Sequence, residues 1–506
     1  MFVKSFLYIS VLIAWSLGSF HTTSRDLTNY QGKNEKNPIS LRLINSTEPL
    51  AYEVWLETKI HEKILNYNGR VRINLRALEA AKMITIHSEK LLIRNYTLFD
   101  HFGNVVSILR MEEHESETIL EFSLQESLKV DQNYILDIEF QGYLQSIPQG
   151  FCYTRYVDAD GETQFMATSN LHVTNARMAF PCYDEPRYRT PFLIHIIHHS
   201  TMKAASNMPV AFITNNNDGS AMTTFENSVS MPVNLVAFAV CNHDSQKTLL
   251  EDKNVEIKFL VPSHVTDETN FARDFIIFIL KKLEEYLGVG YNLPKLECVI
   301  VDDGMHLGLE NWGLMVFDSK SLLYREGQTT ASQKMDIAKI ICHQLSHNYF
   351  GNLVGISWWN YAWMTEGFAN YQEYYFTNMY LTDYPMHDLF VAEFIQRNFV
   401  EHSYLMSHSL NRYVQTRREV EEAFDYGTAS KAAAVLRMCE HAIEGATFQK
   451  GLKKYVKEMS YRVAEPCDLY KNLQEAVNED RTIPEDIKVV DFLSSWVDQP
   501  GFPLLT

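Results

Sequence analysis

The stretch that decides the fold is Cys342-His-Gln-Leu-Ser-His347, followed by Thr365-Glu-Gly-Phe-Ala369. Histidines four apart on a helix lie on one face, and neutral imidazoles placed in this way can reach one ion at about 2.0–2.1 Å. A second helix carrying Glu366 would complete a two-histidine, one-glutamate set, which in catalytic zinc sites leaves a fourth position for water or substrate. Alone, Glu366 would be explained as a charge at a helix terminus. The joint pattern of His343, His347 and Glu366 favours zinc.

Upstream of this stretch, residues from about 40 to 245 alternate apolar and polar side chains with the period of two that is typical of half-buried strands. Residues Val54 and Leu56 belong to one such run and Val71 to Leu75 to another. Turn signals are predicted at 66–69, 158–161 and 215–219, where asparagine, aspartate and glycine cluster. This half is therefore predicted to be a mainly antiparallel β domain.

After about residue 250, apolar residues recur at helical spacing. The run that begins at Phe271 has Gly288 as its predicted stop. One strand is expected at Cys298–Val301, and further helices are expected at 329–350, 362–380, 428–442 and 447–459. The predicted fold class is α+β and multidomain.

Composition limits the function classes. The chain has 506 residues, 46% of them hydrophobic, and a formal charge of −18. These values exclude bulk disorder and collagen-like repeats, and an acidic chain is a poor candidate for nucleic-acid binding, which needs a basic surface. The seven cysteines form no C-x-x-C pair, so we expect buried free thiols, with one disulfide as the alternative.

The first twenty residues resemble a secretory signal. Lys4 precedes the apolar run Phe6–Leu17, and small residues follow it. The run is short for a bilayer span, which takes about 20 apolar residues, so we predict a signal peptide at 1–20 and a secreted protein. An uncleaved N-terminal membrane anchor is the alternative. Sequons at Asn45 and Asn95 predict a glycoprotein, although such short motifs also occur by chance.

Taken together, these motifs resemble the gluzincin zinc aminopeptidases of the aminopeptidase N type. The family pattern is H-E-x-x-H, eighteen residues and then E, and this chain has His343-Gln-Leu-Ser-His347 and Glu366. Its G-A-M-E-N signature is similar to Leu307-Gly-Leu-Glu-Asn311, and its D-A-R-x-A-F-P-C-F-D-E-P motif to Asn175–Pro186. The closing segment Trp496–Pro503 also fits, and the matches follow the family order from about residue 42 onward.

The resemblance implies an N-terminal β-rich domain at 38–248 and a thermolysin-like catalytic-type domain at 249–506. It implies one Zn²⁺ held by His343, His347 and Glu366, and substrate contacts from Glu310, Gly308 and Asn170, with Glu310 capturing the free α-amine of a peptide. The family's pocket-lining Gln and Glu align with Asn170 and His172. Family members usually continue into further domains, so the resemblance also implies a member without them, with an open cleft.

Two positions depart from the family pattern. The family's general base is the Glu of H-E-x-x-H, and this chain has Gln344 there. A carboxamide accepts a hydrogen bond from water but does not take its proton at neutral pH. The family's oxyanion-stabilising Tyr aligns with Ala429, whose methyl group donates no hydrogen bond. Tyr426 lies three residues earlier and is expected to pack near the cleft wall, with substitution for the missing phenol as the alternative.

Three functions follow from these observations. The leading hypothesis is a secreted zinc metallopeptidase homologue that is catalytically impaired and still binds peptides with a free N-terminus. The second is an active zinc aminopeptidase in which water or His306 replaces the base. The third is a non-enzymatic extracellular binding protein without metal. A homodimer, or association with an active relative, is also predicted, whereas a nucleic-acid partner is not.

Overall fold

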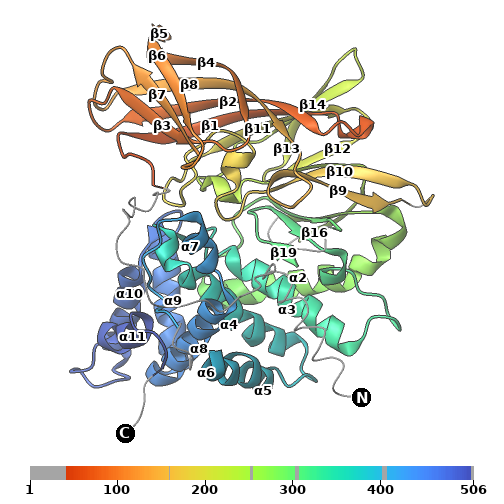
Figure 1. Cartoon of the computed structure of the whole chain (residues 1–506). Helices are drawn as coiled ribbons and strands as arrows, with labels where there is room; N and C mark the ends of the chain where they lie inside the picture. Colours follow the sequence, from red (N-terminus) through yellow and green to blue (C-terminus); the bar gives the residue numbers. More distant parts are fainter. Residues whose placement is uncertain (1–41, 159, 251–254, 303–306, 402–406, 503–506) are drawn as a thin grey trace, which may run out of the picture. The chain divides into compact units, whose positions relative to one another are not determined.

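The computed structural model describes residues 42–158, 160–250, 255–302, 307–401 and 407–502 (Figure 1). The predicted signal peptide at 1–20 and the substitute base His306 lie outside these residues. The described residues from 42 onward belong to one compact unit. The predicted α+β class is confirmed, because strands dominate the first half and helices the second.

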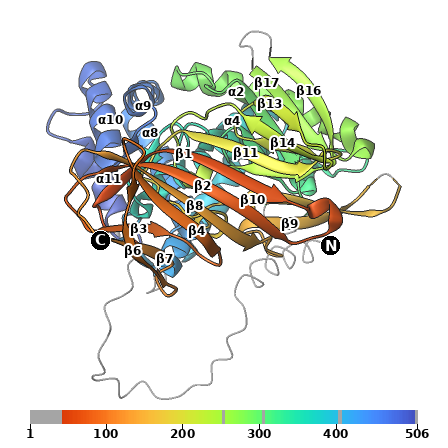
Figure 2. The ribbon, with the colours of Figure 1, turned by 90° about the horizontal axis from the view of Figure 1, so that it is seen from above.

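The first half is organised around an eight-stranded sheet in the order β13-β14-β11-β1-β2-β8-β4-β5, in which only β1 and β11 pair in parallel. Figure 2 looks onto this sheet, with β1, β2 and β8 side by side. Alternate side chains of β1, such as Val54 and Leu56, are fully buried, as the period of two predicts. The strands are β1 Thr47–Thr58, β2 Asn66–Ala77, β4 Leu92–Asp100, β5 Val105–Val106, β8 Asn133–Tyr143, β11 Phe192–His199, β13 Val210–Asn215 and β14 Ser220–Phe225.

Two smaller antiparallel sheets complete this half. One has the order β12-β15-β10-β9 and the other β3-β7-β6. The turn predicted at 215–219 connects β13 to β14 and is confirmed. The turn predicted at 158–161 falls between the paired strands β9 and β10, and its residue 159 lies outside the described residues. The strands are β3 Met83–His87, β6 Ile108–His114, β7 Ile119–Leu124, β9 Gly150–Val157, β10 Thr163–Asn170, β12 Lys203–Ser206 and β15 Phe238–Cys241.

The turn predicted at Asn66–Gly69 is wrong, because these residues begin β2. Gly69 lies opposite Phe140 of β8, and a Cβ on Gly69 would stand 2.2 Å from that ring. The neighbouring Tyr67 is 1% exposed and donates a hydrogen bond of 2.9 Å to the Ala179 carbonyl. The glycine is therefore needed for the close approach of an aromatic ring within a sheet, and not for a turn.

A mixed five-stranded sheet, β16-β17-β18-β20-β19, leads into the helices. The predicted boundary between 248 and 249 falls inside β16. Strand β18 includes most of the strand predicted at Cys298–Val301. The strands are β16 Asp244–Leu250, β17 Val255–Val261, β18 Lys295–Ile300, β19 Gly308–Leu309 and β20 Leu314–Phe317, and the short pair β21 Gly355–Ile356 and β22 Val463–Ala464 lies apart from them.

All five predicted helices are present. Helix α2 ends at Gly288, whose φ of 71° is the left-handed conformation that suits a glycine C-cap. Helix α3 begins with a capping box in which Thr330 and Gln333 bond each other's backbone amides. The helices are α2 Asn270–Leu287, α3 Ala331–His347, α4 Trp363–Tyr380, α5 Met386–Phe390, α6 Arg397–Glu401, α7 Arg417–Glu422, α8 Tyr426–Ile443, α9 Gly445–Met459, α10 Pro466–Asp480 and α11 Val489–Val497, with a π-helical turn at Val391–Gln396.

All seven cysteines lie in the described residues and none of them forms a disulfide; six are buried and Cys467 is exposed. The expectation of buried free thiols is therefore confirmed for six. Among the residues that the structure describes, no helix combines the length and the apolar character needed to cross a membrane.

Candidate metal centre and substrate cleft

The two histidines of α3 direct their Nε2 atoms to one point. These atoms lie 3.1 Å apart, and the ring planes are inclined by 71°. Two nitrogens bound to one tetrahedral zinc at about 2.0–2.1 Å would be separated by roughly 3.3 Å. The spacing of one helical turn between His343 and His347 thus produces the separation that a shared ion requires.

The other ring nitrogen of each histidine has an acceptor. His343 Nδ1 lies 2.9 Å from the Glu373 carboxylate, and His347 Nδ1 lies 3.2 Å from the Phe350 carbonyl. Both acceptors lack hydrogen, so each Nδ1 carries the proton and each neutral ring keeps its Nε2 lone pair free. Such outer partners orient metal-binding imidazoles and increase their basicity.

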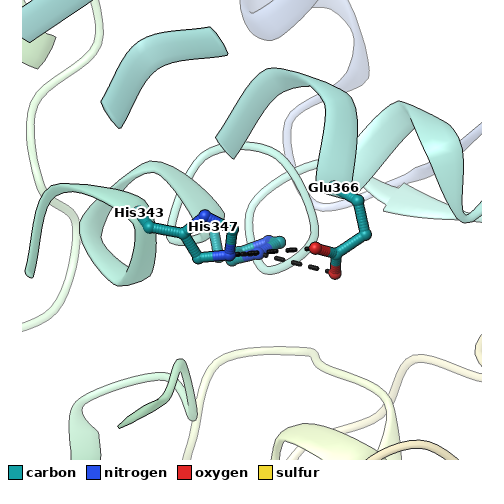
Figure 3. A group of neighbouring side chains, drawn as sticks. All are labelled: His343, His347 and Glu366. Carbon is teal, nitrogen blue, oxygen red and sulfur yellow. Dashed lines mark hydrogen bonds and ion pairs between the residues drawn. The ribbon is translucent and has the colours of Figure 1, made fainter. Parts of the chain in front are cut away.

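Glu366 faces this pair from the first turn of α4 (Figure 3). Its carboxylate oxygens lie 3.8 Å from His343 Nε2 and 3.6 Å from His347 Nε2. The possible ligand atoms of the three residues all lie within 4.8 Å of one another. Its place in the first turn also sets its negative charge near the positive end of the α4 dipole.

The donor set fits zinc. Two imidazole nitrogens with fixed tautomers and one carboxylate oxygen are the ligands of many catalytic zinc sites. His343, His347 and Glu366 would hold the ion, which would polarise a carbonyl oxygen and lower the pKa of a bound water. The sequence-predicted triad is brought together by two helices whose contact is fixed by the core around them.

The carboxylates around the pair affect its protonation. Burial would lower the pKa of His343, but the hydrogen bond to Glu373 and the charges of nearby carboxylates outweigh burial, so this pKa is raised. Burial prevails at His347, whose pKa is lowered.

A cleft beside the triad has His347, Glu366, His172, Glu310 and Phe424 among its lining residues. Glu310 follows β19, and its side chain is 15% exposed. Burial would raise the pKa of Glu310, but His172 and the two histidines of α3 outweigh it and the pKa is lowered. Glu310 therefore presents a negative charge to the cleft.

The other two predicted substrate contacts differ from Glu310. Gly308 packs on α3, because a Cβ there would lie 3.1 Å from Gln344 Cγ and 3.2 Å from the Phe317 ring. Asn170 is 3% exposed and donates a hydrogen bond of 2.7 Å to the Pro148 carbonyl, and it is not among the residues that line the cleft. Gly308 therefore lies against the helix that carries the two histidines, whereas the Asn170 amide is bonded to the loop at Pro148.

Gln344 lies between the two histidines on α3 and is 7% exposed. Its Oε1 is buried without a hydrogen-bond partner among the described residues. A buried acceptor of this kind is normally satisfied by a donor such as ordered water. The carboxamide can therefore accept a hydrogen bond from water, but it does not take a proton from it.

Comparison with known proteins gives two matches of one family. The profile of the peptidase family M1 domain matches residues 271–496, and the profile of the peptidase M1 N-terminal domain matches residues 48–235. Together they cover both halves of the described structure, in chain order. The chain belongs to peptidase family M1.

Curated relatives agree with this assignment. The glutamyl aminopeptidase of Bos taurus is 31% identical over 468 residues, which cover 92% of this chain and 48% of the relative. The aminopeptidase Q of Homo sapiens is 31% identical over 488 residues, covering 92% and 49%. The endoplasmic reticulum aminopeptidase 2 of Bos taurus is 30% identical over 494 residues, covering 92% and 51%. The chain spans about half the length of the curated relatives that it matches.

In this M1 chain, α8 carries Ala429, the residue that the family resemblance aligns with an oxyanion-stabilising Tyr. Ala429 is 9% exposed. Tyr426, at the start of the helix, donates a hydrogen bond of 2.5 Å to the Glu393 carbonyl, and its ring lies 3.9 Å from the Arg397 guanidinium carbon. The Tyr426 hydroxyl is therefore already bonded to the backbone of the π-helical turn at Val391–Gln396.

The N-cap of α8 is Asp425, which accepts from the Thr428 amide at 2.7 Å and lies 3.0 Å from His408 Nε2. Burial would raise the pKa of Asp425, but the hydrogen bonds from His408 and Thr428 outweigh it and lower the pKa to about 2.

Sequence reasoning missed one residue of this site, Glu373, and one contact, that between His172 and Glu310. Glu373, which holds His343, stands seven positions after Glu366 on α4 and so shares its helix face. That spacing could have identified it. His172 contacts Glu310 at 3.6 Å, and no local pattern predicts this pair because the residues come from different halves of the chain.

Proposed function

We propose that this chain is a secreted M1 zinc metallopeptidase homologue that holds zinc and binds peptide N-termini but is impaired in hydrolysis. The observation that carries the proposal is the contrast within one site. The possible zinc donors and their outer partners are in place, whereas a carboxamide stands at position 344 and a methyl group at position 429.

The first loss concerns proton transfer. Peptide hydrolysis at a zinc site needs a base that accepts a proton from the attacking water and an acid that delivers it to the leaving amine. Gln344 can orient the water but performs neither step. General acid–base catalysis is worth roughly 10²–10⁴ in rate.

The second loss concerns the oxyanion. Ala429 offers no donor to a tetrahedral intermediate, and the hydrogen bond of Tyr426 to Glu393 supports the view that this phenol does not replace it. Removal of one oxyanion donor costs roughly 10²–10³. Together the losses reach roughly 10⁴–10⁷ if they are independent. A typical turnover of about 10 per second would fall to 10⁻³ per second or less.

Peptide binding rests on Glu310. A buried carboxylate with a lowered pKa that opens into the cleft can form charge-assisted hydrogen bonds with a peptide ammonium group. Binding without turnover suits a protein that sequesters peptides or modulates an active relative. Self-association stays a prediction that sedimentation would test.

Secretion is supported by the N-terminal apolar run after Lys4. The sequon asparagines Asn45 and Asn95 are both exposed and therefore accessible to glycosylation. Expression in secreting cells, followed by N-terminal sequencing and glycosidase treatment, tests this part: a signal retained in the purified protein would refute it.

The central experiment measures zinc content and hydrolysis together. The purified chain is expected to hold about one zinc and to release almost no product from aminoacyl-anilides. The Gln344→Glu/Ala429→Tyr double variant is expected to regain chelator-sensitive hydrolysis by at least about a hundredfold. The Gln344→Ala variant is the control and should stay as inactive as the natural chain.

Zinc-dependent turnover by the natural chain at ordinary enzyme rates would refute impairment. A folded chain that binds no zinc would refute the metal site and favour a binding protein without metal.

A further inference from the structure

The cleft beside the metal centre contains a hydrogen-bond donor, the His172 imidazole, next to an acceptor, the Glu310 carboxylate. His172 Nε2 lies 3.6 Å from a Glu310 carboxylate oxygen, and the two side chains are 25% and 15% exposed. Both residues line the same cleft as His347 and Glu366. The donor and the acceptor are therefore both open to a ligand that approaches the metal centre.

The His172 ring is held by aromatic neighbours. Its centroid lies 5.1 Å from that of Phe424 and 6.4 Å from that of Trp359, with interplanar angles of 80° and 76°. Edge-to-face packing of this kind restricts a ring to one orientation. The imidazole is thus a positioned donor and not a freely rotating surface group.

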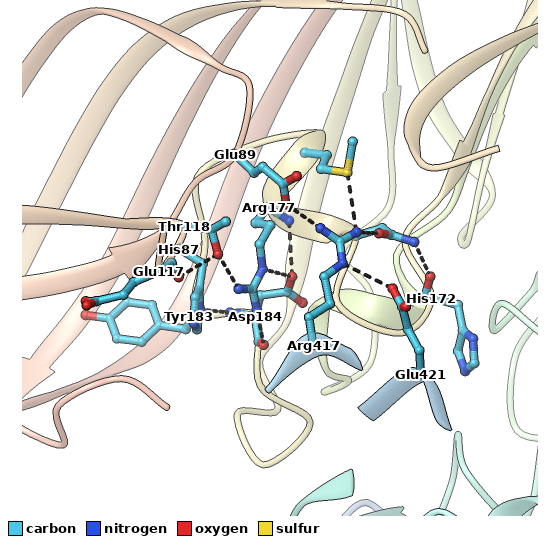
Figure 4. Close-up of polar contacts among 12 residues, drawn as sticks. His87, Glu89, Glu117, Thr118, His172, Arg177, Tyr183, Asp184, Arg417 and Glu421 are labelled. Atoms are coloured by element: carbon cyan, nitrogen blue, oxygen red, sulfur yellow. Dashed lines mark hydrogen bonds and ion pairs between the residues drawn. The ribbon is translucent and has the colours of Figure 1, made fainter. Parts of the chain in front are cut away.

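The backbone of His172 is held as well (Figure 4). Its carbonyl accepts a hydrogen bond of 2.6 Å from Asn175 Nδ2, and Asn175 Oδ1 accepts one of 2.6 Å from Arg417. Arg417, on α7, also pairs with Glu89 at 2.7 Å and with Glu421 at 3.2 Å. This relay connects the segment around His172 to both halves of the chain.

A ligand that satisfies both groups needs a cation and an anion close together. The ammonium of a peptide bonds to Glu310, and an acceptor must then lie one or two groups away to meet His172. In a first residue of aspartate or glutamate, the side-chain carboxylate is two or three carbons from the ammonium. An apolar first residue satisfies only Glu310, the side-chain amide of asparagine offers His172 an uncharged acceptor, and a basic residue would meet a second donor.

We propose that the His172–Glu310 pair makes this cleft selective for peptides whose first residue is aspartate or glutamate. The ammonium bonds to Glu310 and the side-chain carboxylate bonds to His172. This inference rests on the proposed function, because it assumes that peptide N-termini enter the cleft. His172 is then the residue that determines the class of peptide.

The test uses the full zinc-loaded chain and tetrapeptides that differ in the first residue. Titration calorimetry compares Asp-Ala-Ala-Ala, Asn-Ala-Ala-Ala, Lys-Ala-Ala-Ala and N-acetyl-Asp-Ala-Ala-Ala, and mass spectrometry verifies that the peptides stay intact. The Asp peptide is expected to bind about tenfold tighter than the isosteric Asn peptide, because one hydrogen bond becomes charge-assisted. The acetylated peptide is expected to bind at least tenfold more weakly.

Variants identify the residue responsible. His172→Phe removes the donor and keeps a ring beside Phe424 and Trp359. It should weaken the Asp peptide more than the Asn peptide and so remove the preference for Asp over Asn. His172→Glu should reverse the order in favour of the Lys peptide. The control is His114→Phe, since His114 also faces a carboxylate, Glu121 at 3.4 Å, but lies on β6 outside the cleft. The His114→Phe variant should keep the preference for the Asp peptide.

The outcomes separate the two proposals. Equal affinity for the Asp and Asn peptides, with loss on acetylation, would overturn the inference and leave N-terminus binding intact. An equal loss of both peptides in His172→Phe would show that His172 is merely structural and would also overturn it. Failure of every peptide to bind, or equal binding of the acetylated peptide, would overturn the proposed function and the inference with it.

Discussion

Replacement of Glu373 is expected to weaken zinc binding although Glu373 lies outside the triad. Its carboxylate is 2.9 Å from His343 Nδ1, and the residue is 9% exposed. Two changes separate its contributions. Glu373→Gln keeps an acceptor oxygen for the Nδ1 proton but loses the negative charge, whereas Glu373→Ala loses both.

The magnitude follows from the geometry of this hydrogen bond. Loss of an outer partner of a metal-binding histidine typically reduces affinity about 10- to 100-fold, which corresponds to about 1.4–2.8 kcal/mol. A hydrogen bond to a charged group contributes a similar amount, about 1.5–3 kcal/mol. We therefore expect about tenfold weaker zinc binding in Glu373→Gln and about a hundredfold in Glu373→Ala.

The assay is competition for zinc with a chromogenic chelator at fixed pH, with thermal unfolding of the chelator-treated protein as a check on folding. Glu393→Gln is the matched control. Its carboxylate also lies beside α4, where it pairs with Tyr374 and, at 3.3 Å, with Lys339, but no contact joins it to His343 among the described residues. Unchanged affinity in both Glu373 variants, or the same loss in Glu393→Gln, would refute the reasoning.

Two further predictions concern stability. Gly69→Ala places a Cβ 2.2 Å from the Phe140 ring and should destabilise the chain by about 1–3 kcal/mol in denaturant titration, and addition of Phe140→Leu should recover part of the loss; an additive double variant would contradict this packing. The folded pKa of Asp425, about 2, lies below its ordinary value of 3.8, although burial alone would raise it. The stabilisation that the Asp425 charge adds to the free energy of unfolding should be fully present above about pH 4 and lost as the pH falls toward 2. Asp425→Asn keeps the cap without the charge, so an identical acid dependence of unfolding in this variant would contradict the assignment.

Sequence spacing was sufficient to predict that His343 and His347 face the same point, because their relative position depends only on local helix geometry. One helical turn separates His343 from His347, so any regular helix directs both rings to the same side. The residue types at 344 and 429 are likewise read directly from the chain. The alternation in β1 and the glycine stop at Gly288 are also local signals, and the structure has them where they were predicted.

Other features depended on residues that are distant in the sequence. The segment at 66–69 has turn-forming residues, yet the Phe140 ring across the sheet makes it a strand. Asn170 turns to the Pro148 carbonyl, and Tyr426 to the Glu393 carbonyl, because those acceptors are the ones that packing brings within reach. A turn signal or a motif position describes a residue's own preference and not the neighbour it will meet.

The sequence by itself determined the pair of histidines, the glutamate on the next helix and the residue types at positions 344 and 429. Only the tertiary structure decided that Glu373 holds His343, and that His172 faces Glu310 although 138 positions separate them in the chain. The physical reason is the distance along the chain over which each interaction acts. Helix geometry fixes contacts between residues a few positions apart, whereas the residues that line a cleft depend on how sheets and helices from the two halves of the chain pack together.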